Sequence, residues 1–187
     1  PDIHDAYRVN ADGAGSHADV LRGIECLRRN RVEFNILTLV TSANAHHGAE
    51  VYRYLCDMGV AYHQYIPCVE FDGQSRPMPF AVGAEQWGEF LCAVFDEWIS
   101  RDAREVSVRL FDSILEKMVL GSANVCHMRT DCRSYFVGEH NGDVYPCDFF
   151  VEPALKLGNI VTDSWADLLG SPKYAEFGRA KAMWDEA

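Results

Sequence analysis

The sequence predicts an α/β protein in which half of a (β/α) barrel is followed by a small α+β segment. Helix-like and strand-like patterns alternate over the first two thirds of the 187 residues, the strand-like runs are almost continuously apolar, and the pattern becomes that of a hairpin after Gly121. Alternation of this kind favours parallel strands joined by right-handed crossovers. Three such units are too few to close an eight-stranded barrel. We therefore predict a partial barrel in residues 1–122 and a second domain in residues 123–187.

The elements of the first domain follow from hydrophobic periodicity. Val20, Ile24 and Leu27 recur at helical spacing and predict a helix over residues 17–30. Residues 33–41 have the composition of a strand buried on both faces. By the same reasoning we expect helices over residues 46–58 and 85–102 and one ending at Leu120, with strands over residues 60–69 and 106–111.

The second domain is predicted to contain a β-hairpin. Residues 135–140 and 143–147 are strand-like and flank Asn141-Gly142, a dipeptide that suits a type I′ turn. Two short helices are expected after the hairpin, one capped by Asp163 or Ser164 and one beginning at Ser171-Pro172.

Composition excludes several classes of function. The formal net charge of −11 leaves no basic patch for nucleic acid, and no apolar run reaches the ~18 residues of a membrane helix. Seven cysteines without a secretory signal fit reduced thiols in the cytoplasm better than a disulfide framework. Because the sequence starts at Pro1 and stops at Ala187 without natural terminal features, we expect a piece of a longer protein.

Three cysteines gather around the predicted hairpin. Cys126, Cys132 and Cys147 form the pattern C-x5-C-x9-G-x4-C, which favours a soft metal centre, either zinc or an iron–sulfur cluster. Such centres usually take four protein ligands. With zinc, His127 or His140 could supply the fourth. The structural alternative is three buried thiols, since cysteine often packs as a small apolar residue.

These motifs resemble a known family over essentially the whole chain. The cysteine pattern followed by LGNI (157–160) and W-x-D-L (165–168) is similar to the start of a SPASM domain, an extension of radical S-adenosylmethionine (SAM) enzymes. The upstream segments PDIHDAYR, EFNILTLVTSAN, YIPCV and YPCDFF resemble anaerobic sulfatase-maturating enzymes in particular. The resemblance implies SAM and 4Fe–4S clusters as cofactors. It also implies a sulfatase polypeptide as substrate, of which a Cys or Ser is oxidised to formylglycine.

The resemblance also implies roles for individual residues. Cys126, Cys132 and Cys147 would be three ligands of the first auxiliary 4Fe–4S cluster. Asp148 matches the family's proton acceptor, while Arg8 and Val69 match SAM contacts. From the residues alone, Asp148 could instead end a strand or pair with a base such as Arg133, and Arg8 could be a surface cation.

The sequence departs from the family pattern in two places. The radical-generating C-x3-C-x2-C motif is absent, and so is the later cysteine-rich run that completes the auxiliary clusters. We therefore expect this chain by itself to be inactive and, when purified in air, to have an empty site rather than an intact cluster. Half a barrel would also leave strand edges unpaired, which predicts a homodimer. The alternatives are another SPASM-type enzyme that modifies peptides and a zinc-stabilised module that binds a polypeptide without chemistry.

Overall fold

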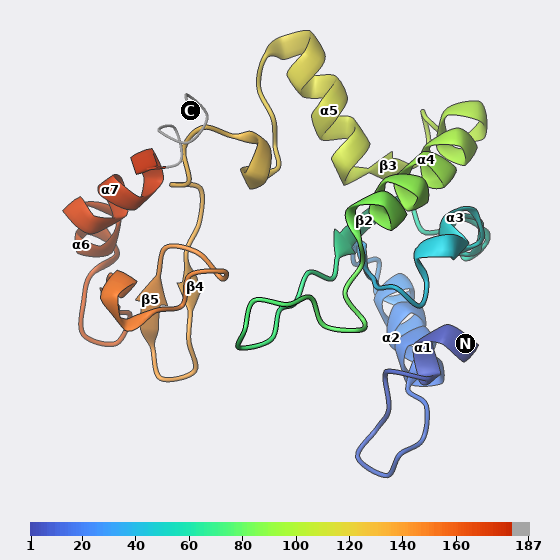
Figure 1. Cartoon of the computed structure of the whole chain (residues 1–187), viewed down its shortest axis with the longest axis horizontal. Coiled ribbons are helices and arrows are strands. Elements are labelled where there is room, and N and C mark those ends of the chain that lie inside the picture. The colour runs from blue at the N-terminus through green and yellow to red at the C-terminus, as the bar shows by residue number, and fades with distance from the viewer. Residues whose placement is uncertain (181–187) are drawn as a thin grey trace. The chain divides into compact units, whose positions relative to one another are not determined.

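A computed structural model describes residues 1–180 of the chain, which divides into two compact units at Asp112/Ser113 (Figure 1). The division lies inside α5 (Arg109–Leu120), whereas the sequence places the boundary after this helix, at residue 122, and that boundary stays a prediction. The α/β class is confirmed. None of the helices in the described part is long and apolar enough to cross a membrane.

The first unit contains a parallel sheet. The strands β1 (Ile36–Val40), β2 (Tyr62–Pro67) and β3 (Ser107–Val108) lie in the order β1-β2-β3 and run parallel. Residues 45–57 between β1 and β2 form η1 (Ala45–His47) and α3 (Gly48–Asp57), and α4 (Ala84–Arg101) lies between β2 and β3. The predicted alternation of helices and parallel strands is thus confirmed.

The core of this unit lies between the sheet and its helices. Phe90, Val94 and Trp98 recur every four residues along α4 and are buried together with Val40 and Val108 of the sheet. Their spacing places them on one helical face, so α4 can cover the strands with a single apolar stripe. The Trp98 indole N–H donates to the Val106 carbonyl oxygen at 2.8 Å, which ties the end of α4 to the start of β3.

Two helices precede the sheet. α1 (Asp2–Asp5) is a short turn, and α2 (His17–Arg29) fills the predicted range almost completely. Ile24 is the buried residue of α2, whereas Val20 and Leu21 on the same face are 44% and 37% exposed. The apolar face of α2 is therefore only partly covered.

The predicted strand over residues 106–111 is wrong in its second half. β3 ends at Val108 and α5 begins at Arg109. Phe111 projects from the helix against Phe95 and Trp98 of α4, at 5.3 Å between ring centroids in each case. A run of apolar residues this short fits a strand or a helix, and the packing against α4 decides between them.

The second unit contains a small antiparallel sheet. β4 (Val137–Gly138), β5 (Asp143–Tyr145) and β6 (Gly158–Asn159) lie in the order β4-β5-β6, so the hairpin is confirmed and a third short strand joins it. The other elements are η2 (Cys126–Met128), η3 (Pro153–Leu155), α6 (Trp165–Leu169) and α7 (Pro172–Ala180). Of the two predicted caps of α6, Ser164 is the one used, since its hydroxyl oxygen accepts the Asp167 N–H at 3.2 Å.

The turn of the hairpin differs from the predicted type I′. A type I′ turn needs positive φ at both central residues, but among the described residues only Gly142 of this turn has it, with φ of 85°. The Gly142 N–H donates to the Glu139 carbonyl at 2.8 Å, so the chain reverses over residues 139–142. Asn141 instead accepts the Asp143 N–H on its side-chain oxygen at 3.0 Å, a local bond that ordinary backbone angles permit.

Candidate functional site

Two of the three predicted cysteine ligands lie around one tyrosine in the second unit. Cys126 opens η2, and Cys147 follows β5 after the buried Pro146. The Tyr135 hydroxyl donates to the Cys126 sulfur at 3.2 Å. This bond, followed by burial and by the nearby charges of Cys126, Cys147 and Asp148, raises the pKa of Tyr135 far above its usual value.

Cys132 is held elsewhere in the same unit. Its backbone N–H donates to the Gly178 carbonyl of α7 at 3.2 Å. Within residues 1–180, no group of three His, Cys, Asp or Glu side chains is arranged to hold a metal ion. The structure therefore brings Cys126 and Cys147 together and leaves Cys132 against α7, and the three-ligand assignment stays a prediction.

The donor set fits an iron–sulfur centre in its chemistry. All seven cysteines are thiols, and Cys126, Cys132 and Cys147 are each half-buried. Burial is the main cause that raises the pKa of Cys147 above its usual value. A cysteine binds metal as a thiolate, so metal binding at Cys147 would release the thiol proton. His140, one candidate for a fourth zinc ligand, is 93% exposed and lies 4.0 Å from the Glu139 carboxylate.

Asp148 is an exposed carboxylate directly beside this pair of thiols. The Cys147 sulfhydryl donates to an Asp148 carboxylate oxygen at 3.5 Å. Arg133, the base considered as a partner for Asp148, pairs instead with Asp131 and holds the pKa of that carboxyl below its usual range. The Asp148 carboxylate is thus fixed next to a predicted ligand while its surface stays open to solvent.

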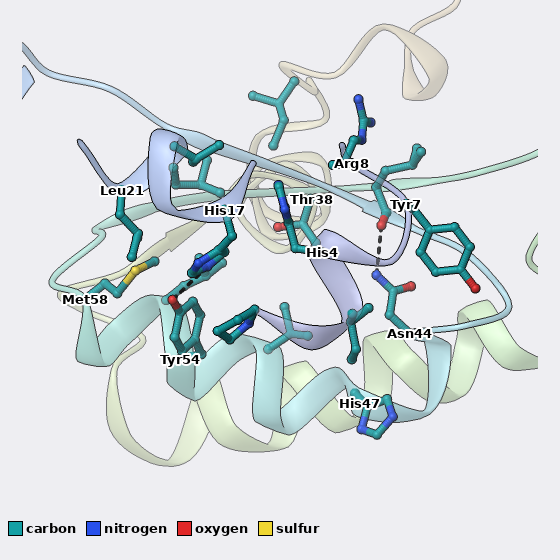
Figure 2. A pocket seen from close by; sticks show the side chains of 18 of the residues that line it. His4, Tyr7, Arg8, His17, Leu21, Thr38, Asn44, His47, Tyr54 and Met58 are labelled. Atoms are coloured by element: carbon teal, nitrogen blue, oxygen red, sulfur yellow. Dashed lines mark hydrogen bonds between the residues drawn. The ribbon is translucent and has the colours of Figure 1, made fainter. Parts of the chain in front are cut away.

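A pocket of about 870 Å³ lies in the first unit, bordered by α1, α2, β1 and α3 (Figure 2). Arg8 lines it, and so do residues 35–39 of β1 and its approach. On its wall His17 and Tyr54 are joined by a 3.0 Å hydrogen bond between the ring nitrogen and the hydroxyl. Val69 lies outside this pocket, shortly after β2, and is 55% exposed. The structure thus does not bring Arg8 and Val69 into one pocket.

Tyr135 is a residue beside Cys126 that the sequence pattern did not single out. It lies within the cysteine-rich stretch, between Cys132 and Cys147, and this position could have marked it as a neighbour of the predicted metal site. Nothing in the pattern shows, however, that its ring turns back toward Cys126.

Comparison with known proteins relates both units to one group of enzymes. Residues 126–186 match the SPASM family, described as an iron–sulfur cluster-binding domain. The chain is 34% identical over 195 residues to a serine-type anaerobic sulfatase-maturating enzyme of Bacteroides thetaiotaomicron, covering 96% of this chain and 47% of that protein. It is likewise 34% identical over 179 residues to a cysteine-type enzyme of Clostridium perfringens, covering 94% of this chain and 48% of the relative.

Solved structures agree with the sequence comparisons. Native anSMEcpe with bound AdoMet superposes with a TM-score of 0.84 at 33% identity, covering 97% of this chain and 50% of that one. A second structure of the same protein, with AdoMet and the Kp18Cys peptide, gives the same TM-score. The chain spans about half the length of these relatives. Over the half of their length that it spans, the chain is similar to anaerobic sulfatase-maturating enzymes, and its residues 126–186 match the SPASM family.

Proposed function

We propose that this chain is the part of an anaerobic sulfatase-maturating enzyme that carries half of the SAM-binding barrel and the first auxiliary cluster site. The intact enzyme would oxidise a Cys or Ser of a sulfatase polypeptide to formylglycine. The observation that carries this proposal is the gathering of Cys126, Cys147 and Asp148 around Tyr135. Relatives named for both the serine-type and the cysteine-type reaction support it.

The cysteines would hold a 4Fe–4S cluster. Cys126, Cys132 and Cys147 are the donors, and soft thiolates are the ligands that iron–sulfur clusters prefer. When bound, the cluster would supply an electron acceptor and SAM the radical that starts the oxidation. Cys132 lies on a loop that is hydrogen-bonded to α7. It would have to approach Cys126 and Cys147 from this loop to become the third ligand.

Asp148 would accept the proton that the substrate carbon loses. Its backbone follows a predicted ligand directly, and its side chain contacts the sulfur of that residue, so the carboxylate would lie beside the reacting side chain of a bound substrate. Because it is exposed, a substrate peptide can reach it without prior opening of the fold.

Arg8 and Val69 would contact SAM. The guanidinium of Arg8 is exposed on the rim of the pocket and can bind a carboxylate through two hydrogen bonds. The Val69 side chain lies past the carboxyl end of β2, the end at which barrel enzymes bind their ligands.

The partner is a polypeptide in the cytoplasm. A net charge of −11 disfavours nucleic acid and is compatible with a basic segment of a sulfatase. Seven thiols in a chain of this length fit a reducing compartment.

We also propose that two copies of the chain pair through β1. This strand is the end strand of its sheet in the described part of the chain, and Leu37 and Leu39 are 57% and 39% exposed. An open apolar edge is a template for pairing, and identical edges can pair about a twofold axis. Leu37→Lys should convert a dimer to a monomer in light scattering, and a wild-type chain that is monomeric at all concentrations contradicts the proposal.

Metal analysis after anaerobic reconstitution tests the cluster site. We expect iron and sulfide uptake by the wild-type chain and its loss in Cys126→Ser and Cys147→Ser. Cys92→Ser is the matched control, because Cys92 is an exposed thiol on α4. Zinc at one equivalent that resists a chelator, with no iron uptake, would favour the zinc-stabilised binding module.

Peptide oxidation by the intact enzyme tests Asp148. Asp148→Asn keeps the shape of the side chain but cannot take up a proton, so SAM cleavage should continue while formylglycine formation is lost. Full formylglycine formation by this variant would remove Asp148 from the role.

A further inference from the structure

Tyr135 makes a specific contact with the predicted cluster site that the proposed reaction does not use. It lies on the segment between Cys132 and β4, and its hydroxyl points back to the Cys126 sulfur at 3.2 Å. The side chain is 43% exposed, so water could have satisfied the hydroxyl without this contact. Burial therefore does not force the hydroxyl onto the sulfur, which indicates that the side chain is oriented specifically toward Cys126.

The backbone of Tyr135 is fixed from the other side. The Tyr174 hydroxyl, on α7, donates to the Tyr135 carbonyl oxygen at 3.1 Å, and Tyr174 is 3% exposed. The Tyr174 ring also packs on Phe136, with 4.7 Å between centroids. The helix that anchors the Cys132 loop thus also anchors the backbone of Tyr135.

The direction of this bond determines its chemistry. A metal-bound cysteine is a thiolate and can only accept, so the tyrosine must donate its proton. A hydrogen bond to a ligand sulfur withdraws charge from it and stabilises the electron-rich state of the centre more than the oxidised state. The reduction potential of the centre then rises.

We propose that Tyr135 is a positioning residue whose hydrogen bond to the Cys126 thiolate raises the reduction potential of the iron–sulfur centre held by Cys126, Cys132 and Cys147. The inference rests on the proposed function, since it needs a cluster at this site. Its consequence is that the centre becomes a better acceptor for an electron leaving the substrate.

The test is a redox titration of the full 187-residue chain, reconstituted anaerobically with iron, sulfide and excess dithiothreitol, whose thiolate can complete the coordination. Tyr135→Phe should retain iron and shift the midpoint potential negative. A tenfold weaker affinity for the electron corresponds to about 59 mV for a one-electron couple. Tyr62→Phe is the control, because it removes an exposed phenol hydroxyl from β2, in the first unit, and should leave the potential unchanged.

A second variant gives a result of opposite sign. Replacing Tyr135 by 3-fluorotyrosine makes the hydroxyl a stronger donor, so the potential should shift positive, which a role in packing alone would not produce. An unchanged potential in iron-loaded Tyr135→Phe overturns the inference and leaves the proposed function standing. If that variant holds no iron, an unshifted potential in the fluorotyrosine protein overturns it. A wild-type chain that takes up no iron overturns both the cluster site and this inference.

Discussion

Replacing Gly142 by alanine should destabilise the hairpin that leads to Cys147. Gly142 has φ of 85°, a region that a residue with a Cβ adopts at a cost. An added Cβ would also lie 2.8 Å from the Asn159 side-chain oxygen and 3.2 Å from a methyl carbon of Val161. Both are closer than an ordinary van der Waals contact, so Asn159 would have to move.

The magnitude follows from the bonds that Asn159 makes. Its amide donates to the Asn141 carbonyl and to the Asp143 carboxylate, each at 3.0 Å, and its oxygen accepts the Val161 N–H at 2.9 Å. Losing one or two such bonds costs about 1–2 kcal/mol. The left-handed backbone adds roughly 1–2 kcal/mol, of which the lower entropy of the unfolded alanine chain returns about 0.5 kcal/mol. We expect the free energy of unfolding to fall by about 1.5–3.5 kcal/mol in total.

Urea unfolding of three alanine variants separates these contributions. Gly121 ends α5 with φ of 73° and has open space around its Cβ position, so Gly121→Ala measures the backbone cost alone. Gly138 in β4 has ordinary φ and open space, so Gly138→Ala should change stability by less than about 0.5 kcal/mol. If Gly142→Ala lowered the free energy of unfolding no more than Gly121→Ala, the Asn159 contact would contribute nothing to the cost.

Three further predictions concern other parts of the chain. Phe90→Ala should cost about 3–5 kcal/mol by urea unfolding, because the ring is fully buried between sheet and helix. The Lys156 hydrogen bond lowers the pKa of Asp143 below 3.8, so this carboxylate adds stability above that pH and loses it as pH falls through the folded-state pKa. Asp143→Asn should therefore flatten the acid limb of a stability–pH curve. Gly178→Ala should reduce iron uptake, because its Cβ would overlap the Arg133 side chain beside a predicted ligand.

Much of the fold could be predicted because local pattern and tertiary packing agree. The helices at residues 17–30 and 85–102 became α2 and α4 almost without change, since each has one apolar face to cover. The prediction of a strand over residues 106–111 was wrong in its second half because Phe111 packs on α4 from a helix. A short apolar run does not show which element it will pack against. The prediction of a type I′ turn was wrong for a similar reason. The Asn141 side chain accepts the Asp143 N–H, and the backbone of Asn141 keeps an ordinary negative φ.

The sequence indicated which residues could act as ligands at the candidate site, but only partly how they are arranged in space. Cysteine spacing across a hairpin indicated the three donors, and the structure gathers Cys126 with Cys147. Sequence spacing does not reveal that Cys132 is bonded to α7, since that contact depends on how a distant helix docks. The hydrogen bond from Tyr135 depends on the same docking, through Tyr174.

This dependence on α7 links metal binding to the stability of the second unit. The three proposed ligands come from η2, from the loop bonded to α7 and from the chain after β5, so joint binding of one cluster would require all three elements to be docked. A group that binds the folded state alone stabilises it by mass action. Variants that loosen the hairpin or α7, such as Gly142→Ala and Gly178→Ala, should therefore lower iron affinity even though neither removes a ligand. Their effects on iron affinity should follow their effects on unfolding free energy, whereas Cys126→Ser should abolish iron binding with a much smaller change in stability.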